Sequence, residues 1–179
     1  MLNKVNILIS GRPGCGKSTL VNRLVETARK KHINVGGIST PEFRLPTGKR
    51  GGFLIQNLAT GMEQIMASVD QSSPISVGRY GVNLDAIRNL GVTAINQAVT
   101  EADLVVIDEI GKMEIAAPDF LTSVIKALDS SIPVLGTIGL WLKTPQINEL
   151  KNRKDVTLKI LTPETRNQLY QSIMSLLGL

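Results

Sequence analysis

The sequence predicts one α/β domain over residues 1–179, with a mostly parallel sheet between two layers of helices and an antiparallel hairpin added at one edge. Three observations support this three-layer fold. Short apolar runs alternate with stretches whose apolar residues recur at helical spacing. The run Leu104-Val105-Val106-Ile107 is continuously apolar, as in a central strand covered on both faces. Residues 41–69 interrupt the alternation with several glycines and prolines, which favours a hairpin.

The elements follow in chain order. The parallel strands are predicted at residues 5–9, 35–39, 104–107, 134–138 and 156–160, and the hairpin strands at 53–55 and 65–67. Apolar stripes predict helices at residues 16–31, 84–98 and 118–128. A C-terminal helix is expected to begin at Thr162-Pro163-Glu164, because Thr162 can cap it and proline is well tolerated at the first helical position.

The composition narrows the class of protein. Hydrophobic residues make up 42% and charged residues 20%, as in a soluble globular protein, and no apolar run is long enough for a membrane helix. The lone cysteine, Cys15, makes a reducing cytoplasm the default compartment. The net charge of +5 suits an anionic substrate, whereas scattered basic residues and 3% aromatics disfavour nucleic acid as a partner. A monomer is the default expectation.

A glycine-rich motif lies between the first strand and the first helix. Residues 11–18 read Gly11-Arg12-Pro13-Gly14-Cys15-Gly16-Lys17-Ser18, followed by Thr19. This is the pattern G-x-x-x-x-G-K-[ST], in which backbone N–H groups at a helix N-terminus cradle phosphates. Lys17 can reach the β- and γ-phosphates, and the Ser18 hydroxyl can bind Mg²⁺. The motif therefore predicts that the protein binds a nucleoside triphosphate such as ATP or GTP.

A pair of carboxylates ends the central strand. Asp108 has the placement of a Walker B aspartate that holds Mg²⁺ through water. Side chains alternate along a strand, so Glu109 is expected to point the other way, where it can polarise the attacking water. The nucleotide site is accordingly expected to include this strand end: Val105, Val106, Ile107, Asp108, Glu109, Ile110, Gly111 and Lys112.

Phosphoryl transfer also needs positive charge near the transition state. Lys17 is one such catalytic group, and Lys112 and Arg44 are the further candidates, with Arg50 and Arg79 behind them. Thr137 lies at the end of the next strand, where it can either sense the γ-phosphate or the nucleophilic water, or cap a turn.

Three classes of function remain open on these residues. A hydrolase is favoured, because a glutamate directly follows the Walker B aspartate. A phosphotransferase with a small-molecule acceptor is the main alternative, since kinases combine the same loop with arginines on a lid. A nucleotide-gated module that binds RNA or protein is the third. A signalling GTPase is weakly supported, because the nearest match to N-K-x-D, Asn152-Arg153-Lys154-Asp155, has its lysine misplaced.

Several motifs together resemble the THEP-type nucleoside-triphosphatase family nearly end to end. They are the glycine-rich loop, Thr40-Pro41-Glu42-Phe43-Arg44, Lys49-Arg50-Gly51-Gly52-Phe53, residues 77–82, residues 106–114, residues 135–138 and residues 152–156. The resemblance implies a RecA-like P-loop fold and slow, Mg²⁺-dependent hydrolysis of several nucleoside triphosphates. Two segments depart from the family pattern: Thr165-Arg166-Asn167 has threonine where asparagine is usual, and residues 139–143 lack the usual basic or histidine side chains.

Overall fold

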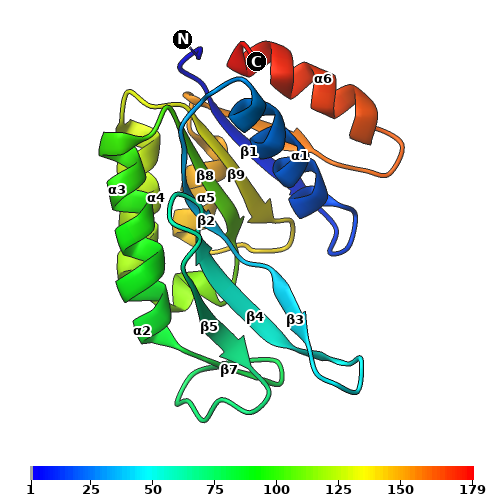
Figure 1. Ribbon diagram of the computed structural model, residues 1–179, viewed down its shortest axis with the longest axis vertical. Helices are drawn as coiled ribbons and strands as arrows, with labels where there is room; N and C mark the ends of the chain where they lie inside the picture. The colour runs from blue at the N-terminus through cyan, green and yellow to red at the C-terminus, as the bar shows by residue number, and fades with distance from the viewer. Residues whose placement is uncertain (1) are drawn as a thin grey trace.

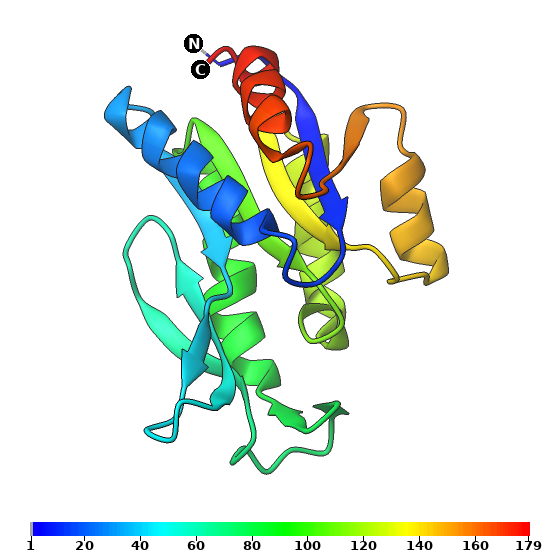
Figure 2. The same cartoon turned by 90° about the vertical axis from the view of Figure 1, so that its right-hand side faces the viewer.

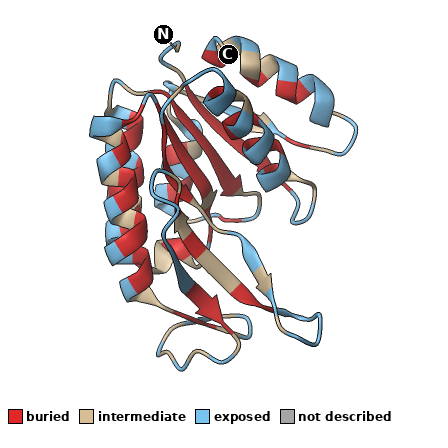
Figure 3. Cartoon of the chain, in the orientation of Figure 1, coloured by how far each residue is buried: buried red, intermediate tan, exposed pale blue. Residues whose placement is uncertain are grey.

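The computed structural model describes residues 2–179 and confirms the three-layer α/β fold, with a mostly parallel sheet at its centre (Figure 1). Five parallel strands lie in the order β10-β1-β9-β8-β2. Their bounds are β1 Asn6–Gly11, β2 Val35–Ser39, β8 Leu104–Ile110, β9 Val134–Gly139 and β10 Val156–Ile160. All six residues of β1 are buried, and the inner strands are covered on both faces (Figure 3).

An antiparallel extension continues the sheet beyond β2, as the break in the sequence pattern predicts. Within residues 2–179 it brings the sheet to ten strands, and it is larger than the expected hairpin. The added strands are β3 Glu42–Arg44, β4 Arg50–Asn57, β5 Glu63–Ser68, β6 Ser76–Val77 and β7 Tyr80–Val82. The extension projects from the lower end of the parallel sheet in Figure 1, on the side where the parallel strands end.

Helices cover both faces of the parallel sheet (Figures 1 and 2). Helices α1 (Lys17–Lys30) and α6 (Arg166–Leu177) pack on one face, where their apolar residues share a core with β1 and β8. On the other face lie α3 (Thr93–Glu101), α4 (Pro118–Asp129) and α5 (Pro145–Asn152), which build a second core. No helix within residues 2–179 has both the length and the apolar character needed to cross a bilayer.

The helix predicted at residues 84–98 is continuous but not uniform. It comprises α2 (Leu84–Ala86), a π-helical segment η1 (Ile87–Val92) and α3. Gly91 lies in the π-helical segment, where an added Cβ would come within 2.5 Å of the Ile55 side chain on β4. The missing side chain therefore lets the helix lie close against the antiparallel extension. A short 3₁₀ turn, η2 (Glu114–Ala116), precedes α4.

The predicted start of the C-terminal helix is wrong by a few residues. Helix α6 begins at Arg166, because Thr165 accepts a hydrogen bond from the Thr162 amide at 3.1 Å and holds residues 162–165 in a turn. The same Thr-Pro signal does start a helix at Thr144, whose hydroxyl accepts a bond from the Ile147 amide at 3.3 Å. The sequence indicates a helix-like stretch here, just before residue 152, but does not give the bounds of α5.

Candidate active site

A cleft opens where the parallel strands end, between the glycine-rich loop and the antiparallel extension. Its volume is about 930 Å³. The loop, the first turns of α1 and the ends of β2, β8 and β9 supply most of its walls, and β4 closes the far side. Ligands of α/β proteins bind at this edge of the sheet, because the loops after parallel strands meet there.

The glycine-rich loop has the geometry of an anion site. Gly14 and Gly16 adopt positive φ angles of 75° and 98°, a conformation that glycine tolerates and that turns the chain sharply into α1. No side chain among the described residues caps the first turn of α1, so its amide groups face the cleft unbound. Lys17 is only 9% exposed, and its ammonium donates to the Gly11 carbonyl at 3.3 Å. A phosphate placed here can accept hydrogen bonds from the amide groups of this turn and from the Lys17 ammonium.

Asp108 lies beside the loop, as predicted. Its side chain is 3% exposed, and the buried Thr137 hydroxyl donates to its Oδ1 at 2.5 Å. Burial raises the pKa of the Asp108 carboxyl, while the hydroxyls of Thr137 and Ser18 and the charge of Lys17 oppose the rise. Of the two roles considered for Thr137, capping a turn is not seen. Its hydroxyl instead fixes the orientation of Asp108.

The expected direction of Glu109 is wrong. Both carboxylates line the cleft, and Glu109 Oε2 lies 4.0 Å from the Lys17 ammonium. The peptide bond that joins Asp108 and Glu109 is cis. Strict alternation fails because the pairing of β8 with β9 shifts between Ile107 and Ile110, where β8 has an extra residue. Burial raises the pKa of Glu109, opposed by the charge of Lys17 and reinforced by that of Asp108.

Thr40, at the end of β2, holds the backbone of the carboxylate pair. Its hydroxyl donates to the Asp108 carbonyl at 3.0 Å and accepts a hydrogen bond from the Glu109 amide at 3.2 Å. The Thr40 side chain therefore fixes both peptide groups at the strand end. Sequence reasoning did not single out this role, because it depends on β2 lying beside β8 in the sheet.

A third carboxyl group lies beneath the pair. Glu114 is 3% exposed, and a Cβ added at Gly111 would lie 2.7 Å from Glu114 Oε2 and 2.8 Å from Glu109 Oε1. A side chain at residue 111 would therefore displace at least one of the two carboxyl groups. Burial, and then the charge of Glu109, raise the pKa of Glu114 to about 8, so at neutral pH its carboxyl holds a proton.

The buried acid predicts a pH dependence of stability. The folded protein retains the Glu114 proton up to about pH 8, whereas the unfolded chain loses it near the ordinary value of 4.5. Between these values the folded state binds more protons, so the free energy of unfolding falls as pH rises, by at most about 1.4 kcal/mol per pH unit for one group. Urea unfolding from pH 5 to 8 measures this slope.

The substitution Glu114→Gln is expected to flatten that profile without abolishing it, because the pKa values of Asp108 and Glu109 are also raised. Glu149→Gln, at an exposed position on α5, provides the matched control and leaves the slope unchanged. A Glu114→Gln profile as steep as that of the unaltered protein would contradict the assignment of the retained proton to Glu114.

Of the candidate cations for the transition state, the structure places some in the cleft and others outside it. Lys112 lines the cleft at an exposed position. Arg44 does not line it: its guanidinium binds Glu42 at 3.0 Å and the Gly48 carbonyl at 2.9 Å on the hairpin. Arg50 does line the cleft and contacts Glu42 at 2.6 Å. Arg79 donates to the Arg50 carbonyl at 3.0 Å, outside the cleft lining.

The candidate guanine-reading motif lies at the wrong end of the sheet. Asp155 accepts a hydrogen bond from Asn6, the first residue of β1, at 3.0 Å. It also pairs with Arg153 at 2.8 Å. The glycine-rich loop follows the other end of β1, so residues 152–155 cannot contact a base bound there. This placement argues against a signalling GTPase that reads guanine through residues 152–155.

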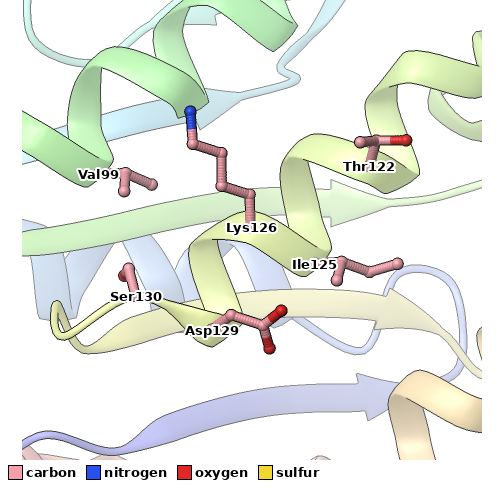
Figure 4. Close-up of a pocket in the computed structure, with 6 residues that line it drawn as sticks. All are labelled: Val99, Thr122, Ile125, Lys126, Asp129 and Ser130. Carbon is pink, nitrogen blue, oxygen red and sulfur yellow. The ribbon is translucent and has the colours of Figure 1, made fainter.

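A second hollow, of about 490 Å³, lies on the helix layer, against α3 and α4 (Figure 4). It is lined by Val99, Thr122, Ile125, Lys126, Asp129 and Ser130. Asp129 already pairs with Arg153 at the helix end. This hollow lacks the amide-rich loop and the buried carboxylates of the cleft, so we assign the chemistry to the cleft.

The fold and the cleft define a P-loop nucleotide-binding protein whose phosphate loop faces a Walker B aspartate and an adjacent glutamate. Comparisons with known proteins agree, since the model of a family described as NTPase matches residues 6–174. The chain belongs to this family, whose curated members similar to it include nucleoside-triphosphatases of the THEP1 type.

The similarity to individual relatives extends over nearly the whole chain. Nucleoside-triphosphatase THEP1 of Methanothermobacter thermautotrophicus is 40% identical over 97% of both chains, and that of Thermotoga sp. strain RQ2 is 42% identical over 97% of this chain and 95% of its own. The crystal structure of THEP1 from Aquifex aeolicus has a TM-score of 0.87 at 33% identity, covering 98% of this chain and 100% of that one. A human cancer-related nucleoside triphosphatase has a TM-score of 0.81 at 31% identity, with 96% of each chain covered.

Proposed function

We propose that this protein hydrolyses nucleoside triphosphates to nucleoside diphosphate and phosphate, that the reaction depends on Mg²⁺, and that several bases are accepted. The observation that carries the proposal is the position of Glu109. Its carboxylate lies 4.0 Å from the Lys17 ammonium, at the γ-phosphate end of the loop, where an attacking water has to be oriented.

Each group of the site has a role in this reaction. The loop amides and Lys17 bind the β- and γ-phosphates and offset their charge. Glu109 accepts a hydrogen bond from the water and takes up its proton as the water oxygen bonds to the γ-phosphorus. The bond from that phosphorus to the β-phosphate oxygen breaks, and the diphosphate leaves. A raised pKa brings Glu109 closer to the range in which a carboxylate is an effective base.

The residues beside the loop fit Mg²⁺. The Ser18 hydroxyl and the Asp108 carboxylate are hard oxygen donors, and the Thr137 hydroxyl binds Oδ1 of Asp108, which orients the carboxylate. Two protein donors are what Mg²⁺ normally uses when phosphates and water complete its shell. When bound, the ion supplies charge neutralisation at the phosphates. Ser18 and Asp108 are the residues that would hold it.

The transition-state cation is proposed to come from the cleft wall. Lys112 and Arg50 line the cleft, whereas Arg44 is held on the hairpin by Glu42 and the Gly48 carbonyl. Because an exposed lysine has freedom to move toward the phosphate, Lys112 is the first candidate for this role. Arg44 would need to leave both of its partners before reaching the γ-phosphate.

Phosphate release from ATP, GTP, CTP and UTP tests the proposed function. With Mg²⁺ and no acceptor, we expect release from all four, and chelation of Mg²⁺ by EDTA should stop it. The absence of phosphate release from any of the four would overturn the assignment of hydrolysis.

Transfer to a small-molecule acceptor is a second candidate, favoured by the extent of the cleft. Beyond the loop the cleft continues to a wall formed by Arg50, Phe53 and Met66, which phosphates at the loop do not fill. The same assay with nucleosides, nucleotides and RNA added separates the candidates. An acceptor that becomes phosphorylated while free phosphate falls would favour transfer, and an RNA that changes only the rate would favour a nucleotide-gated module.

The cytoplasmic location and the monomeric state of the protein stay predictions.

A further inference from the structure

Arg166 connects the start of α6 to the glycine-rich loop. Its Nη2 donates to the Cys15 carbonyl at 3.0 Å, across 151 residues of chain. The side chain is exposed, and within residues 2–179 no carboxylate forms an ion pair with it. The proposed hydrolysis assigns no role to this cation, although it lies directly against the phosphate-binding loop.

The guanidinium of Arg166 lies flat on the loop. A Cβ added at Gly16 would be 3.0 Å from Nη2, 3.1 Å from Cζ and 3.2 Å from Nε. A point almost equally far from these three atoms lies above the plane that they define. One face of the guanidinium therefore covers Gly16, which lines the cleft, while Arg166 itself is exposed and lies just outside the cleft lining.

The order of the strands indicates which end of a nucleotide passes Arg166. Strand β1 has β9 and then β8 on one side, and β10 on the other. Asp108 and Glu109 end β8, so they mark the γ-phosphate end of the site. A triphosphate laid across the loop amides with its γ-phosphate there directs the nucleoside toward the opposite side. That is the side of β10 and α6, where Arg166 lies.

We propose that Arg166 is a base-stacking platform, with the guanidinium face turned away from Gly16 packed against the purine or pyrimidine of the bound nucleotide. A guanidinium is planar and delocalised, and it stacks well on aromatic rings. Because every base offers a π-face, such a platform binds the nucleoside without reading its identity. The inference rests on the proposed function and explains how one site accepts several bases.

Binding without turnover tests this role. Titration calorimetry with Mg²⁺ compares the β,γ-imido analogues of ATP, GTP and UTP with inorganic tripolyphosphate, which lacks a nucleoside. Arg166→Ala is expected to weaken the three analogues by about tenfold and to leave the affinity for tripolyphosphate nearly unchanged. Arg166→Lys keeps the charge and a donor for the Cys15 carbonyl but lacks the flat face, so it should show the same selective loss.

Arg23→Ala is the matched control. Arg23 lies on α1, and its guanidinium stacks on Tyr170 of α6 at 3.9 Å without contacting the loop. The Arg23→Ala substitution should leave the affinities for the three analogues and for tripolyphosphate unchanged. An equal loss for tripolyphosphate and the analogues would reduce Arg166 to a support for the loop, and no loss at all would place the base elsewhere; either result overturns the proposal. Failure of the unaltered protein to bind any of these probes would overturn nucleotide binding itself.

Discussion

Replacing Glu109 by glutamine is expected to lower the rate of phosphate release at least about a hundredfold while nucleotide affinity is retained. Glutamine fills the same space beside Lys17 but cannot accept a proton from water. The substitution leaves unchanged the loop amides and Lys17, which are proposed to bind the phosphates, and Asp108, which would hold Mg²⁺. Single-turnover phosphate release gives the rate, and titration with a β,γ-imido analogue gives the affinity.

Glu101→Gln, at the exposed end of α3, controls for the loss of one carboxylate from the chain. It should leave the rate and the affinity as they are. Unchanged phosphate release by Glu109→Gln would remove Glu109 from the mechanism, and a loss confined to affinity would assign it to binding instead.

Lys17→Met is expected to have the larger effect, because it removes the buried ammonium that is proposed to bind the phosphates. Methionine has a similar length and no charge, so the γ-phosphate loses its cation and Glu109 loses its neighbour at 4.0 Å. We expect kcat/KM to fall by roughly a thousandfold, the order of magnitude associated with loss of a charge-stabilising group. Phosphate release over a range of ATP concentrations measures the change.

Lys4→Met is the matched control for Lys17→Met. The Lys4 ammonium also donates to a backbone carbonyl, that of Ile132 at 2.8 Å, but it precedes β1 and lies at the far end of the sheet from the loop. We expect it to lower the free energy of unfolding and to leave kcat/KM unchanged. Equal losses of kcat/KM in both variants would show that the effect comes from stability rather than from phosphate contact.

The sequence predicted the parts of the site that depend on local pattern. The glycine-rich loop carries its own geometry, since the spacing of Gly14, Gly16 and Lys17 defines both the turn and the cation. The apolar run before Asp108 identifies a central strand, and a carboxylate at its end must lie near the loop. The parallel sheet and its two helical layers follow from the same alternation of strands and helices.

The parts that sequence reasoning missed depend on pairing between distant segments. Thr40 holds the carboxylate pair only because β2 lies beside β8, and Arg166 reaches Cys15 across 151 residues. The short strands β3, β6 and β7 have too few residues for a periodic signal. The two Thr-Pro pairs look alike in sequence, yet only Thr144 caps a helix, because Thr162 forms a turn with Thr165.

The extra residue in β8 has a consequence for how hydrolysis is encoded in this chain. Successive side chains along a strand point to opposite faces, and this alternation shifts only where a residue is added or removed. The extra residue is one of the carboxylate pair itself, because only Asp108 and Glu109 lie between Ile107 and Ile110. A one-residue deletion that restored the alternation would therefore remove one of the two carboxylates, so the irregular strand end and the carboxylate pair are kept or lost together.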